Sequence, residues 1–227
     1  MNEQPNEAVI EIDGLNFTYP NGRTIFKDLS VKFNAGRFYL IRGASGAGKS
    51  TLLRLLIRLE EATGGGIRFK GRTLGDYPPE RLRRNILYVQ QTPTVIAGTV
   101  RDNLLLPFRF QANADLAPPL DKLLSAQLHK FLLADVGLET DAKTLSVGQL
   151  QRLCLIRGLL LTPRVVLLDE PASALDETSR KIVEETAELL CTNDGLTVIM
   201  VSHRNFKPIE VTPVILEISQ SGLEEAA

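Results

Sequence analysis

The sequence predicts an α/β fold with a mostly parallel core sheet, an N-terminal antiparallel β-subdomain and an inserted α-helical subdomain. Near-continuous apolar runs, "RFYLIRG", "RVVLLDE" and "LTVIMVSH", are typical of strands buried on both faces of a parallel sheet. The early run "LSVKF" instead alternates apolar and polar residues, as a half-buried antiparallel strand does. Helix-like segments separate the apolar runs, and this alternation is typical of α/β proteins.

Each expected element follows from its own local pattern. "AVIEI" and "LNFTY" indicate two strands, and "PNG" indicates a turn after them. "STLLRLLIRLE" has Leu52, Leu55, Leu56 and Leu59 at helical spacing, directly after the first buried strand. "GGGIRFKG" indicates a short strand. "ETSRKIVEETAELLC" indicates a helix, and "VTPVILEIS" is expected to be an edge strand.

We expect a single domain over residues 1–227, with the helical subdomain at about 92–160. Prolines at positions 107, 118 and 119 punctuate the first part of this region. Its segment "LDKLLSAQLHKFLLADVGL" places six apolar residues on one helical face. These residues are Leu120, Leu123, Leu124, Leu128, Phe131 and Leu132. His129 lies off this face and is expected to be exposed to solvent.

Composition excludes several classes of protein. The 26 basic and 27 acidic residues nearly balance, which argues against a nucleic-acid partner and against a polybasic membrane anchor. Two cysteines, Cys154 and Cys191, do not make a disulfide framework and favour a reduced cytosolic protein. The polar, acidic N-terminus does not resemble a signal peptide. No apolar run approaches the roughly 18 residues that span a bilayer, so any spanning would fall to another chain.

The stretch "GASGAGKS" fits the phosphate-loop pattern G-x-x-x-x-G-K-[ST] and stands between an expected strand and an expected helix. Its glycines allow a tight turn that brings backbone N–H groups against phosphate oxygens. Lys49 would reach the β- and γ-phosphates, and the Ser50 hydroxyl would ligate Mg²⁺. The residues expected to bind the nucleotide here are Gly43, Ala44, Ser45, Gly46, Ala47, Gly48, Lys49, Ser50 and Thr51.

Two acids, Asp169 and Glu170, follow the apolar run "RVVLL". A strand-end aspartate in a phosphate-loop fold binds Mg²⁺ directly or through water, and the adjacent glutamate can act as general base on the attacking water. The alternative is that these acids merely cap the next helix. A second anion-binding helix start is indicated by "KTLSVGQLQR", which is polar, contains glycine and leads into "LCLIRGLL".

Together, the phosphate loop, "YVQQ", "LSVGQLQR", "LLDEP", "SALD" and "VSH" resemble an ATP-binding cassette (ABC) ATPase over essentially the whole chain. The resemblance implies a C2 homodimer of head-to-tail cassettes around two ATP molecules, formed in an ATP-dependent way. Ser146, Gly148 and Gln149 of one copy would contact the γ-phosphate bound to the other copy. Asp176 would lie at the dimer interface. Val147 departs from the commonest signature, LSGGQ, but leaves the N–H groups of the loop in place.

The same resemblance assigns further roles. Gln91 would lie near Mg²⁺ and the attacking water, with Gln90 as an alternative one residue earlier. His203 would hold the γ-phosphate and orient Glu170 and the water. Tyr19 would stack on adenine, although an ordinary strand-end tyrosine is the alternative. Lys49, Gln91, Glu170 and His203 are thus the expected catalytic set. The cluster of Arg81, Arg83 and Arg84 is expected to be a solvated helix face.

The resemblance also implies a separate transmembrane permease subunit, so that the protein would lie peripherally on the cytoplasmic face of the membrane. The region after Gln91 would dock that subunit. More narrowly, "QTPTVIAGTVRDNLLLPF", "LIRGLLLTP" and "LLDEPASALDE" are similar to FetA/YbbL-type cassettes, which are associated with iron export. The alternatives are a soluble ABC ATPase acting in DNA repair or translation, and a phosphate-loop kinase or GTPase outside this family.

Overall fold

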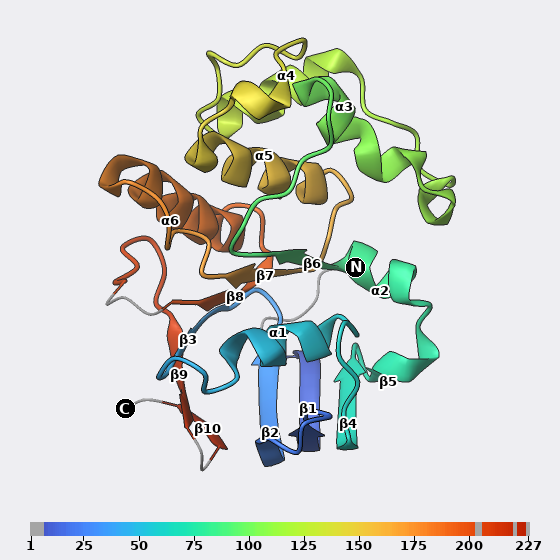
Figure 1. Cartoon of the computed structure of the whole chain (residues 1–227), viewed down its shortest axis with the longest axis vertical. Helices are drawn as coiled ribbons and strands as arrows, with labels where there is room; N and C mark the ends of the chain where they lie inside the picture. The colour runs from blue at the N-terminus through green and yellow to red at the C-terminus, as the bar shows by residue number, and fades with distance from the viewer. Residues whose placement is uncertain (1–6, 203–205, 220–221, 226–227) are drawn as a thin grey trace.

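The computed structural model describes residues 7–202, 206–219 and 222–225, which form two sheets with helices on both faces of the larger one (Figure 1). The smaller sheet is antiparallel, with the order β2-β1-β4-β5. Its strands are β1 (Ala8–Thr18), β2 (Thr24–Asn34), β4 (Gly64–Phe69) and β5 (Arg72–Thr73). The two strands predicted before the first turn are one strand, β1, which shifts register around Gly14 (φ +56°).

The larger sheet has the order β10-β9-β3-β8-β7-β6, and every pair except β9 with β10 is parallel. Its strands are β3 (Phe38–Arg42), β6 (Ile86–Val89), β7 (Val165–Asp169), β8 (Thr197–Val201), β9 (Val214–Ser219) and β10 (Gly222–Glu225). The mostly parallel core sheet is confirmed. The edge position predicted for β9 is wrong, because β10 pairs with its outer side.

Within the residues that the structure describes, the helical elements outside the inserted region are α1 (Lys49–Leu56), η1 (Leu74–Asp76), α2 (Pro79–Asn85) and α6 (Glu177–Thr192). Figure 1 shows α1 between the two sheets and α6 on the opposite face of the larger sheet. Helix α1 is shorter than its leucine spacing predicted. Arg58 adopts φ +54° just after its end, so Leu59 leaves the helical face and is 51% exposed.

The inserted region is mostly helical, as predicted, and lies on the same side of the larger sheet as α6 in Figure 1. Its elements are α3 (Val100–Leu105), η2 (Leu106–Arg109), η3 (Gln111–Asn113), α4 (Asp121–Lys130), η4 (Ala142–Thr144) and α5 (Val147–Leu159). The apolar face of α4 is narrower than predicted, because only Leu124, Leu128 and Phe131 are buried. The exposed fractions of the other three are Leu120 80%, Leu123 47% and Leu132 60%. His129 is exposed, as expected.

Side chains of the larger sheet alternate between two hydrophobic clusters. Ile41, Leu167 and Ile199 pack toward α1 and the smaller sheet, whereas Leu40 and Leu168 pack toward α5 and α6. The strands are therefore buried on both faces, which explains their continuous apolar runs. Within the described ranges, no helix is long and apolar enough to cross a membrane.

Candidate active site

The phosphate loop links β3 to α1 at the carboxyl end of the central strand β3. Gly43 (φ +148°) and Gly48 (φ +101°) adopt backbone angles that disfavour side chains. A Cβ at Gly48 would come within 2.4 Å of the Ile25 side chain. The loop therefore needs glycine here for conformation and for close packing against the smaller sheet.

Lys49 crosses this loop as the first residue of α1. Its ammonium donates to the carbonyls of Gly43 at 2.9 Å and Ala44 at 2.8 Å. Burial lowers the pKa of the Lys49 ammonium, and the nearby carboxylates of Glu170 and Asp169 act in the opposite direction. The structure thus gathers one cation and two anions, predicted separately from the sequence, around a single loop.

Asp169 is the last residue of the buried strand β7, and its carboxylate contacts Ser50. The Ser50 hydroxyl donates to Asp169 Oδ1 at 2.7 Å, and the Tyr88 hydroxyl donates to Asp169 Oδ2 at 2.7 Å. A hydroxyl and a carboxylate in contact fit Mg²⁺, which takes oxygen ligands and uses few protein groups when phosphates complete its shell. Ser50 and Asp169 would hold the ion, while sequence reasoning missed Tyr88.

Glu170 follows directly in an unusual backbone conformation, φ +49°. Its N–H donates to Val201 O at 3.2 Å. Such angles cost about 1–3 kcal/mol and recur at functional sites. Gln91 donates to Ser173 Oγ at 3.0 Å, and Ser173 Oγ in turn donates to Glu170 O at 3.0 Å. Gln91 therefore connects the loop after β6 to the loop that carries Glu170.

Gln90, the alternative to Gln91, is differently placed. Its carbonyl accepts from Gln151 Nε2 at 3.2 Å, and its side chain donates to Thr94 Oγ1 at 3.5 Å. Both contacts lead into the inserted region and away from Glu170. The geometry therefore favours Gln91, as the family pattern does.

Tyr19 stands at one wall of a hollow of about 260 Å³ in front of the phosphate loop. Its hydroxyl pairs with Thr51 Oγ1 at 2.8 Å, and Arg54 Nη2 donates to it at 3.4 Å. Arg23 lines the same hollow and donates to Gly46 O at 2.8 Å. Arg23 and Arg54 were not predicted, since neither belongs to a motif.

The helix start predicted in "KTLSVGQLQR" is confirmed as the beginning of α5, and anion binding there remains a prediction. Ser146 is its N-cap and forms a capping box with Gln149. Ser146 Oγ accepts from Gln149 N at 3.3 Å, and Gln149 Oε1 accepts from Ser146 N at 2.9 Å. Ser146 is exposed and Val147 is 50% exposed, so this helix start faces solvent.

Gly148 is packed too closely for a side chain. A Cβ there would lie 2.9 Å from Ser179 Cβ and Oγ, at the start of α6. Asp176, the N-cap of α6, accepts from Ser179 N at 2.9 Å, and this bond lowers the pKa of the Asp176 carboxyl. The "SALD" and "LSVGQ" motifs thus meet in one chain, at the first turns of α5 and α6. His203 lies outside the described residues.

A family model described as ABC transporter matches residues 26–173. The chain belongs to the ABC transporter family. It is 34% identical to the probable iron export ATP-binding protein FetA of Escherichia coli (strain K12), over 88% of this chain and 87% of FetA. It is 36% identical to the sophorolipid transporter of Starmerella bombicola, over 97% of this chain but only 18% of that protein.

Among solved structures, cbiO1 from Clostridium perfringens, part of the ABC transporter complex cbiONQ, superimposes with a TM-score of 0.79. The alignment covers 96% of this chain and 88% of that one at 21% identity, which shows the shared fold. The predicted ABC ATPase fold is confirmed. The chain is the ATP-binding part of an ABC transporter, and ATP hydrolysis in a transporter is its activity.

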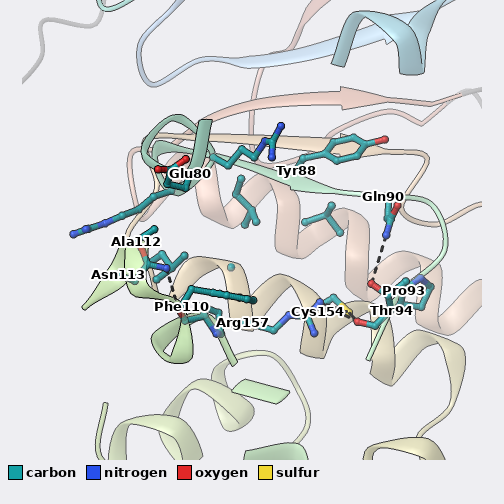
Figure 2. Close-up of a pocket in the computed structure, with 17 residues that line it drawn as sticks. Glu80, Tyr88, Gln90, Pro93, Thr94, Phe110, Ala112, Asn113, Cys154 and Arg157 are labelled. Carbon is teal, nitrogen blue, oxygen red and sulfur yellow. Dashed lines mark hydrogen bonds between the residues drawn. The ribbon is translucent and has the colours of Figure 1, made fainter. Parts of the chain in front are cut away.

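This ABC ATPase has a further hollow, of about 460 Å³, between β6 and the inserted region (Figure 2). Figure 2 shows Tyr88 and Gln90 on one wall, with Cys154 and Arg157 of α5 on another. The carbonyl of Thr94 accepts from Arg157 Nη2 at 2.9 Å and from Cys154 Sγ at 3.4 Å. These bonds fix the segment after Gln91 against α5.

The arginine cluster on α2 is largely exposed, as predicted, since Arg81 and Arg83 are exposed and Arg84 is half-buried. Each arginine also has a protein partner. Arg84 and Arg81 pair with Asp115 at 2.9 and 3.2 Å. Arg83 donates to the carbonyl of Arg58 at 2.7 Å. Arg83 and Arg84 also line the 460 Å³ hollow, so the cluster gives that hollow a basic rim.

Proposed function

We propose that this chain drives a separate membrane subunit by pairing head to tail with a second copy around two MgATP. One observation carries the proposal. The chain presents a phosphate-loop hollow and, on another helix, a capped N-terminus whose Ser146 and Val147 face solvent. A solvent-facing helix start with oriented N–H groups is suited to an anion held by another molecule.

In this mechanism Lys49 and His203 hold the γ-phosphate of the ATP bound to their own chain, and Ser146 of the partner subunit completes its coordination. Glu170 accepts a proton from the attacking water, and Gln91 positions that water through its link to the Glu170 loop. Mg²⁺ held by Ser50 and Asp169 would neutralise charge that develops on the phosphate oxygens. Loss of the γ-phosphate removes the contacts from the partner subunit, and the pair opens.

The 460 Å³ hollow is the surface we propose for the membrane subunit. It lies between β6 and α5 and is lined by Gln90, whose neighbour in sequence, Gln91, donates to Ser173 in the loop after Glu170. Its basic rim suits an acidic or polar segment, and Phe110, 56% exposed, offers an apolar contact. Peripheral attachment to the cytoplasmic face of the membrane follows from this docking.

Metal export, with iron as the cargo, is the narrower part of the proposal and rests on the similarity to FetA. The roles proposed above concern nucleotide and not cargo, so cargo must be tested by transport. Co-purification with a membrane subunit, and iron efflux that depends on both chains, would support it. Stimulation of the ATPase by nucleic acid would instead favour a role in DNA repair or translation.

The decisive experiment measures the solution mass of Glu170→Gln by light scattering, with and without MgATP. Loss of a general base lowers turnover by about 100-fold or more, while ATP binding should remain. We expect a monomer without nucleotide and a dimer with MgATP.

Lys49→Ala in the same background is the control, because it should stay monomeric through loss of nucleotide. A Glu170→Gln protein that binds MgATP and remains monomeric would contradict pairing by the isolated chain. Normal turnover in Glu170→Gln would remove Glu170 from its proposed role.

A further inference from the structure

Tyr88 has no part in the catalytic steps proposed above, yet its hydroxyl reaches the carboxylate beside the phosphate loop. It lies on the edge strand β6, and β6 pairs in parallel with β7, which ends at Asp169. The Tyr88 hydroxyl donates to Asp169 Oδ2 at 2.7 Å across 81 positions of sequence. The opposite oxygen, Oδ1, accepts from Ser50 Oγ at 2.7 Å.

Asp169 is only 5% exposed, so water contributes little to its solvation. The two hydrogen bonds on its two oxygens satisfy this buried carboxylate and fix the plane of the group.

The two donors to Asp169 differ in one respect. Ser50 is itself an expected Mg²⁺ ligand, so its oxygen would turn toward the ion when the ion binds. Tyr88 packs among hydrophobic residues on the α1 side of the sheet and has no such alternative role. Its hydrogen bond to Oδ2 would therefore persist and leave Oδ1 directed at the ion.

We propose that Tyr88 is a positioning residue for the ATPase, whose hydroxyl holds the Asp169 carboxylate in the orientation that Mg²⁺ and nucleotide require. The inference rests on the proposed role of Asp169 as the magnesium carboxylate. Tyr88 does not touch nucleotide and acts only through Asp169.

The test is the contribution of Mg²⁺ to nucleotide affinity, measured with a fluorescent ATP analogue in EDTA and in excess Mg²⁺. Glu170→Gln serves as the background, so that turnover does not interfere. Tyr88→Phe should reduce the gain in affinity from Mg²⁺ about tenfold, the usual loss for one hydrogen bond to a charged group. Affinity in EDTA should stay unchanged.

Tyr77→Phe is the matched control, since the Tyr77 hydroxyl donates to Phe69 O at 3.0 Å in the smaller sheet. It should keep the full gain from Mg²⁺. Equal losses in EDTA and in Mg²⁺ for Tyr88→Phe, or no loss in either, would overturn the proposal. Asp169→Asn distinguishes failure of the role proposed for Tyr88 from failure of the metal site. If Asp169→Asn keeps the full gain in affinity from Mg²⁺, the proposed metal site itself is wrong.

Discussion

Arg23 illustrates how single residues outside the motifs shape the nucleotide hollow. It lies on the turn before β2, and its guanidinium donates to Gly46 O in the middle of the phosphate loop. The bond restrains the loop and places a positive charge on the wall of the hollow. Because Arg23 is exposed, its contribution is modest and sensitive to salt.

We expect Arg23→Gln to weaken MgATP binding about fivefold, which corresponds to roughly 1 kcal/mol for an exposed charge-assisted hydrogen bond. The measurement is titration calorimetry at low and high salt, and the deficit should shrink at high salt. Lys27→Gln removes an exposed charge from β2, the strand that follows Arg23, and should bind normally. A deficit of equal size in Lys27→Gln would mean that overall charge, and not the loop contact, is responsible.

For single residues, the sequence predicts the site residues that belong to motifs. It misses those that come close to the site only when the chain folds. Gly43, Lys49, Ser50 and Asp169 are recognisable because their chemistry depends on fixed spacing. Tyr88 and Arg23 reach the same site from β6 and from the turn before β2, and no local pattern reports contacts made 81 and 23 positions away in the chain. Tyr88 is the first residue of the "YVQQ" motif, which marks its position but not its contact with Asp169.

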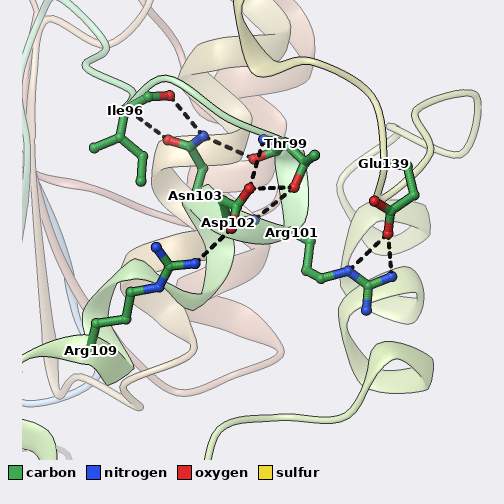
Figure 3. Close-up of polar contacts among 7 residues, drawn as sticks. All are labelled: Ile96, Thr99, Arg101, Asp102, Asn103, Arg109 and Glu139. Atoms are coloured by element: carbon green, nitrogen blue, oxygen red, sulfur yellow. Dashed lines mark hydrogen bonds and ion pairs between the residues drawn. The ribbon is translucent and has the colours of Figure 1, made fainter.

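At the scale of elements, α3 shows how a short helix is held in the inserted region (Figure 3). Thr99 and Asp102 form a capping box at its start, and Arg109 pairs with Asp102 at 2.6 Å. Asn103, fully buried, donates to Ile96 O and Thr99 O at 3.1 and 3.0 Å. A six-residue helix is only marginally stable by itself, so these bonds provide the stability that a longer helix would have from its own hydrogen bonds.

Asp102→Ala should therefore destabilise the protein, in a pH-dependent way. Hydrogen bonds from Thr99, then from Arg109, lower the pKa of the Asp102 carboxyl below its ordinary value. A carboxyl whose pKa is lower in the folded than in the unfolded protein stabilises the fold at pH values above its unfolded pKa, which is about 4. That stabilisation is lost as the pH falls toward the folded pKa. Urea unfolding should show a constant deficit from pH 7 to 5 that shrinks below about pH 4. A deficit that persists unchanged at pH 3.5 would exclude the ionised carboxylate as its cause.

Element boundaries were less predictable than element types. The three apolar runs predicted as core strands formed β3, β7 and β8, yet β9 is interior because the short segment "GLEE" pairs beside it as β10. That segment is too short and acidic to stand out as a strand. Likewise, the leucines in and beside α4 recur at helical spacing but are not equally buried. Leu124 and Leu128 pack in the core, whereas Leu120 is exposed to solvent.

At the scale of the whole molecule, Val147 offers a test of pairing that leaves the monomer intact. It is the first residue of α5 and is 50% exposed, so the fold does not depend on its side chain. An acidic residue in a first turn favours the helix. The same acid would repel a γ-phosphate presented by the partner subunit. Val147→Asp should thus leave folding intact and weaken pairing.

In the Glu170→Gln background, we expect Val147→Asp to preserve or raise the unfolding temperature and to keep nucleotide affinity. Like charges brought together at an interface cost several kcal/mol, so the MgATP-dependent dimer should weaken about 100-fold. Sedimentation over a range of concentrations measures this. Val147→Asn, neutral and of the same shape as aspartate, should dimerise far better. If aspartate and asparagine weaken the dimer equally, shape and not phosphate charge governs the contact; if neither does, the start of α5 does not face the nucleotide of the partner subunit.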